Sequence, residues 1–163
     1  MESNLTIQNN PGRATLLEMR ADSTRYPRLK SVTREQAVYE MSKIVNQAFL
    51  YRGQEVVPTN TQFIATALVD ELLADNQYGA ANISFAEIQV VVKRAVLGGT
   101  EMFGVSVATL YKVIMDYVKG EGHNNERQIA EMRRQDADRR LKDSIIAPML
   151  QAYSGKFTKE HKI

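Results

Sequence analysis

The sequence predicts an all-α protein: a compact bundle of about four helices, with an extended N-terminal arm and a long, charged, projecting C-terminal helix. Three observations lead to this prediction. Apolar residues recur at helical spacing through residues 33–119. Capping pairs precede several of these stretches, and glycines follow them. A run rich in charges of both signs comes last. We therefore expect an arm over residues 1–32, a helical core over 33–122, and a charged helix with a basic tail over 123–163.

The N-terminal segment shows no sustained hydrophobic period. Pro11-Gly12 and Pro27 interrupt it, and only Ala14–Met19 has the composition of a short helical turn. An extended arm and a disordered terminus explain this composition equally well.

Two helices are predicted to open the core. Thr33 and Gln36 have the spacing of a capping box, and an apolar stripe follows them as far as Gly53. A second helix is expected to begin at Thr59, after Pro58 closes a short loop. The apolar residues of both stretches lie three and four apart, so each helix should have one buried face.

The third core helix has the clearest predicted start. Ser84 and Glu87 form a capping box, and Ile83 and Ile88 stand at the positions of a hydrophobic staple. Gly98-Gly99 is expected to end this helix.

In the next segment Gly104-Val105-Ser106 is followed by Thr109-Leu110-Tyr111, a pattern that resembles the turn and second helix of many bacterial helix-turn-helix proteins. Gly104 permits a turn, and Ser106 is suited to cap a fourth helix that runs from Val107 to about Lys119. The outward face of this helix would meet the major groove of DNA. The candidate nucleic-acid-binding residues are this face with its cap and two nearby cations: Ser106, Val107, Ala108, Tyr111, Lys112, Lys93 and Arg94.

The same segment departs from the helix-turn-helix pattern in two respects. Gly98-Gly99 stands where the first helix of the motif should continue, which leaves only Thr100–Phe103 to supply it. Lys112 is the single cation of the outward face, and no Arg, Asn or Gln is present there to bind base edges. A helix pair that serves packing alone is the alternative.

After an expected loop over residues 120–125, a long helix is predicted over Glu126–Ala147, with Pro148 kinking or ending it. Its segment Glu126–Asp143 has six Lys/Arg and five Asp/Glu, several of them spaced for i,i+4 pairs. This near balance favours a solvated helix or a helix in the seam of an oligomer. A protein partner or a sister subunit would order it most easily.

Composition excludes several classes of function. The chain has no cysteine, so it has neither disulfides nor thiolate metal sites. Its formal net charge is +2, with seven Lys/Arg against ten acids over residues 33–122; a dedicated nucleic-acid binder usually carries a stronger basic excess. No apolar stretch is long enough to span a membrane. His123 and His161, the only histidines, lie in an expected loop and tail. We therefore predict no enzyme, metal, cofactor or small-molecule substrate.

The stretch Ile83–Tyr117 resembles uncharacterised small helical proteins of Bacteroidetes phages and mobile elements. Its similar parts read Ser-Phe-Ala-Glu-Ile, Leu-Gly-Gly-Thr-Glu-Met-Phe-Gly-Val-Ser and Tyr-Lys-Val-Ile-Met-Asp-Tyr, and the whole stretch covers about a fifth of the chain. The resemblance implies an accessory protein that handles DNA replication or its control. It supplies no catalytic residues.

Two functional hypotheses follow. The first is a non-enzymatic DNA-associated accessory protein of a phage or mobile element, acting in replication or transcription control. The second is a helical structural or adaptor protein that acts through protein contacts in an oligomer or phage particle, with Glu126–Ala147 as its contact helix. Either would work in the cytoplasm of a bacterial host or within a phage particle.

Overall fold

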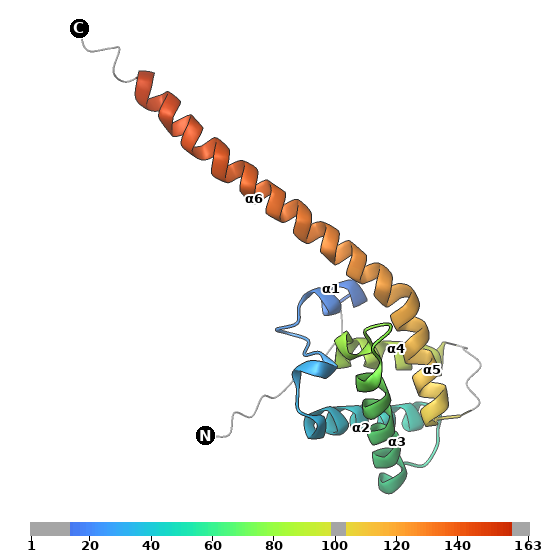
Figure 1. Cartoon of the computed structure of the whole chain (residues 1–163). Coiled ribbons are helices and arrows are strands. Elements are labelled where there is room, and N and C mark those ends of the chain that lie inside the picture. The colour runs from blue at the N-terminus through green and yellow to red at the C-terminus, as the bar shows by residue number, and fades with distance from the viewer. Residues whose placement is uncertain (1–13, 99–103, 158–163) are drawn as a thin grey trace. The chain divides into compact units, whose positions relative to one another are not determined.

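A computed structural model describes residues 14–98 and 104–157 of the chain. Within these ranges every regular element is helical, apart from one isolated β-bridge between Arg28 and Ser84. The all-α prediction is therefore confirmed (Figure 1). The chain divides into two compact units, one ending at Glu126 and the other beginning at Arg127.

The first unit is built on the pair α2 (Arg34–Tyr51) and α3 (Pro58–Ala74), which pack against each other. The predicted capping box of α2 is formed: the Thr33 side chain accepts from the backbone of Gln36, and the Gln36 side chain accepts from the backbone of Thr33. The predicted start of α3 is wrong by one residue. Pro58 occupies the first helical position, where its fixed φ fits and its missing N–H is not needed.

Two further helices complete this bundle, α4 (Phe85–Leu97) and α5 (Val107–Tyr117). Both begin as predicted. Ser84 caps α4 together with Glu87, and the staple residues Ile83 and Ile88 are fully buried. Ser106 caps α5. α4 packs against α2 and α5, and α5 also packs against α3 (Figure 1).

The N-terminal segment requires a correction. The prediction of an arm over residues 1–32 is wrong for residues 14–32, which form α1 (Leu16–Ala21) and the 3₁₀ turn η1 (Leu29–Ser31); residues 1–13 lie outside the described ranges. Four apolar side chains of this segment are buried in the core: Leu16, Met19, Tyr26 and Leu29. The sequence does contain a signal for this helix that our prediction missed: Thr15 and Glu18 form a capping box, and Leu16 and Met19 form a buried apolar face.

The segment after α5 also differs from prediction. The loop expected over residues 120–125 is absent, because the π-helical turn η3 (Val118–Gly122) joins α5 directly to α6 (His123–Phe157). Gly120 and Gly122 lie where the helix changes from α to π geometry, and they do not end it. Pro148 lies inside α6 and does not end it, since the residues on both sides keep helical geometry around the one lost backbone donor.

Candidate functional site

The outer face of α5 is only partly as predicted. Ser106, Ala108 and Lys112 are exposed. Val107 and Tyr111, which were expected to face outward, are half-buried and pack against the core. They are therefore poor candidates for base contacts. Thr100–Phe103, the residues left to supply the first helix of a helix-turn-helix motif, lie outside the described residues.

The two remaining candidates, Lys93 and Arg94, are exposed near the end of α4. Their contacts are with α2 and η3. The ammonium of Lys93 lies 5.8 Å from the ring centre of Tyr51 in α2. A guanidinium nitrogen of Arg94 lies 3.5 Å from a carboxylate oxygen of Glu121 in η3. No interaction between described residues joins either cation to Lys112.

The sequence did not reveal a buried polar network at the meeting of α1, α4 and the α5–α6 junction. Arg20 of α1 donates from Nε to Oε1 of Glu87 over 2.6 Å and from Nη1 to Oε1 of Glu126 over 2.7 Å. The hydroxyl of Tyr117 donates to the same Glu87 oxygen over 2.6 Å. The other Glu87 oxygen accepts from the backbone and the hydroxyl of Ser84.

The charged and polar groups of this network stabilise one another's protonation states. Burial lowers the pKa of Arg20, but the charge and hydrogen bond of Glu87, together with the nearby Tyr117 and Glu126, outweigh burial and raise this pKa. Burial and the neighbouring Glu87 charge both raise the pKa of Tyr117, so its proton stays in the hydrogen bond. Arg20 is 3% exposed and Glu87 is not exposed at all, so a substrate cannot reach them. The network links α1, α4 and the α5–α6 junction.

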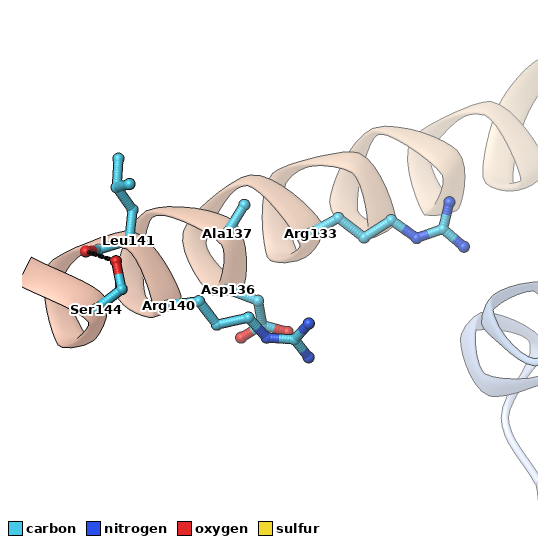
Figure 2. Close-up of a pocket in the computed structure, with 6 residues that line it drawn as sticks. All are labelled: Arg133, Asp136, Ala137, Arg140, Leu141 and Ser144. Atoms are coloured by element: carbon cyan, nitrogen blue, oxygen red, sulfur yellow. Dashed lines mark hydrogen bonds between the residues drawn. The ribbon is translucent and has the colours of Figure 1, made fainter.

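The second unit is α6 from Arg127 onward, and it offers a different surface. Every residue from 130 to 151 is exposed. Figure 2 shows a pocket whose lining comes from one face of this helix: Arg133, Asp136, Ala137, Arg140, Leu141 and Ser144. Their spacing of three and four residues puts them in one strip, with Ala137 and Leu141 on one side of it and Asp136 and Arg140 on the other. The i,i+4 ion pairs that the spacing of this segment suggested, such as Asp136 with Arg140, are not formed among the described residues of this unit.

A further stretch of α6, residues 145–150, is apolar throughout. Four of its large side chains are at least half exposed: Ile145 (55%), Ile146 (50%), Met149 (57%) and Leu150 (65%). Ala147 and Pro148 between them are exposed as well.

Other kinds of site are not seen in the described part of the chain. No cluster of three or more His, Cys, Asp or Glu residues there is arranged to hold a metal ion. None of the described helices combines the length and apolar character needed to cross a membrane. In comparisons with known proteins, no family model, curated protein or solved structure matches this chain.

Proposed function

We propose that this protein is a non-enzymatic helical adaptor that works through protein contacts, with α6 from Arg127 onward as its docking element in a homo-oligomer. One observation carries the proposal: six consecutive residues, Ile145–Leu150, are apolar and exposed. Contiguous exposed apolar surface on a water-soluble helix is typical of an interface.

The large side chains of this segment gather on one side of the helix. Consecutive residues of an α-helix are about 100° apart, so Ile145, Ile146, Met149 and Leu150 fall within roughly 140° of its circumference. An apolar stripe of this width suits the surface of a neighbouring chain, as in an oligomer.

The charged part of α6 would supply specificity. Arg133, Asp136 and Arg140 are exposed and form no ion pair among the described residues. Charges of both signs are therefore free to pair with a neighbour, which sets register and selects partners more than it adds affinity.

Light scattering over a range of protein concentrations tests the proposal. We expect a particle mass that is a multiple of the 18.4 kDa chain mass, and we expect Leu150→Asp to lower it to that of one chain. Leu50→Asp is a matched control, because both leucines are 65% exposed on helices and Leu50 belongs to the first unit. A single-chain mass at every concentration, or equal loss in both variants, would contradict the proposal.

DNA association through α5 is a second proposal, supported by the exposure of Ser106, Ala108 and Lys112 beside the capped helix start. Anisotropy of a labelled DNA duplex tests it. We expect binding at low salt that weakens as salt rises, and a salt slope about one smaller for Lys112→Ala. The resemblance to phage and mobile-element proteins would place either activity in a bacterial cytoplasm or a phage particle. Absence of duplex binding at low salt would remove this second proposal and leave the first intact.

A further inference from the structure

Helices α2 and α4 end side by side. The Gln89 side chain donates to the Gln47 side chain over 3.0 Å, and one turn further along each helix Lys93 lies over the ring of Tyr51. Both helices advance four residues between these two contacts, so they run parallel here. Their last turns therefore lie at the same end of the bundle.

These last turns carry an unusual mixture of exposed side chains. Tyr51 is 40% exposed, and the apolar neighbours Leu50 (65%) and Leu97 (57%) are more exposed still. Three cations accompany them, and all three are exposed: Arg52, Lys93 and Arg94. Leu97 is four residues after Lys93 and so lies beside it on α4. We call these six residues the Tyr51–Lys93 patch.

Arg94 of the patch pairs with an acidic residue that does not neutralise it. Glu121 pairs with Arg94 at 3.5 Å, but the two side chains are 52% and 62% exposed. Exposed pairs of this kind are weak and are screened by water and salt. A phosphate group can replace the carboxylate of Glu121, and a guanidinium binds phosphate through two parallel hydrogen bonds.

We propose that the Tyr51–Lys93 patch binds single-stranded nucleic acid. An accessible aromatic ring among cations has the two components that such sites combine, a platform on which a base stacks and charges that follow the phosphates. Tyr51 would stack on a base, with Leu50 and Leu97 extending the apolar surface. Lys93, Arg94 and Arg52 would contact phosphates. In a duplex the base faces are already stacked on each other, so this ring favours an unpaired strand.

This site is separate from the two proposed functions. It does not involve α6, and it shares with the α5 proposal only the class of ligand. A failure of light scattering to detect oligomers, or of Lys112→Ala to change duplex binding, would leave it untouched.

Fluorescence anisotropy of a labelled oligothymidylate with the full chain tests the site. We expect binding at low salt and a loss of about tenfold in affinity for Tyr51→Ala, because stacking of one base on an aromatic ring has this magnitude. Tyr51→Phe keeps the ring and should bind normally. Replacing both Lys93 and Arg94 by alanine should weaken binding and reduce the salt slope by about 1.4, since about 0.7 of a counterion is released per phosphate contact on a single strand.

The chain provides a matched control in a second exposed lysine–tyrosine pair. Lys119 lies 4.5 Å from the ring centre of Tyr78, which is 43% exposed. Tyr78→Ala and Lys119→Ala should bind the oligonucleotide like the unchanged chain. Circular dichroism melting of every variant separates loss of binding from loss of folding, since cations at helix C-termini also stabilise helices.

Three results would overturn the assignment. The first is no binding to the oligonucleotide at low salt. The second is an equal loss of affinity in the Tyr51 and Tyr78 variants, which would indicate general attraction to the surface. The third is equally good competition by a duplex together with unchanged affinity of Tyr51→Ala, which would indicate phosphate contacts without stacking.

Discussion

The buried charges of the first unit and the exposed charges of the second differ in where their partners lie. In the first unit Arg20 and Glu87 are buried, and each makes at least two hydrogen bonds to other side chains. In the second unit Arg133 and Arg140 are exposed beside apolar residues that are exposed too. A charge whose partners lie in the same chain specifies how that chain packs. A charge without such partners contributes little to folding and remains available to a neighbouring molecule.

The substitution with the largest expected effect on stability is Glu87→Ala. Removing this carboxylate leaves the guanidinium of Arg20 buried without its main partner and removes the acceptor of the Tyr117 hydroxyl. Breaking a buried ion pair from one side typically costs about 3–5 kcal/mol. We expect a loss of that size in the free energy of unfolding, measured by urea denaturation.

The matched control is Arg34→Ala, which removes a surface ion pair. Arg34 and Asp70 form two hydrogen bonds of 2.8 and 2.7 Å, a geometry as good as that of the buried pair. Because both side chains are about half exposed, water replaces the lost partner and the urea midpoint should scarcely move. Similar losses in both variants would mean that burial does not distinguish the two pairs.

Tyr117→Phe should have the next largest effect. It removes one of the hydrogen bonds to the buried Glu87 carboxylate, and a hydrogen bond to a charged group contributes about 1.5–3 kcal/mol. The same variant makes a prediction about pH. The pKa of Tyr117 is raised in the folded chain, so its contribution to stability is complete below the unfolded pKa of about 10 and is lost as pH rises above it.

The alkaline loss of stability should therefore be smaller in Tyr117→Phe than in the unchanged chain. Urea midpoints on either side of pH about 10 measure the difference. Parallel declines in the two proteins would show that Tyr117 titrates normally and that its hydrogen bond to Glu87 is not maintained in solution.

Two glycines of η3 give a smaller and sharper comparison. Gly120 is exposed and an added Cβ would meet nothing within 4 Å, so Gly120→Ala should stabilise the chain by up to about 1 kcal/mol through helix propensity. At Gly122 the Cβ would lie 3.1 Å from the carbonyl oxygen of Tyr117 and 3.5 Å from the Arg20 guanidinium. We expect Gly122→Ala to lose that gain or to destabilise, as measured by thermal unfolding. An equal gain at both positions would show that the network tolerates a methyl group there.

Sequence patterns predicted the parts of the first unit that depend on local chemistry. The starts of α2, α4 and α5 follow from capping residues that act within four positions, at Thr33, Ser84 and Ser106. The role of Arg20 could not be predicted in this way, because its partner Glu87 is 67 residues away and is brought near only by tertiary packing. Glu87 itself was identified as a capping residue, which explains one of its two oxygens. The exposure of Lys112 followed from helical period, but the contact of Lys93 with Tyr51 depends on how α2 packs against α4.

The smallest expected effect is that of Leu141→Ala in α6. Leu141 is 61% exposed, so removing its methyl groups loses little buried apolar contact. The free energy of unfolding should therefore change by no more than about 0.5 kcal/mol. Leu68→Ala in α3 is the counterpart, because Leu68 is fully buried and a cavity there should cost about 2–5 kcal/mol. Both are measured by urea denaturation at a protein concentration low enough to suppress association.

At a concentration high enough for assembly, the Leu141 variant should become less stable than the unchanged chain, because binding between folded chains adds to stability by mass action. A loss above 1 kcal/mol already in the dilute sample would show that Leu141 packs within its own chain. In that case α6 could not be the surface that a neighbour covers.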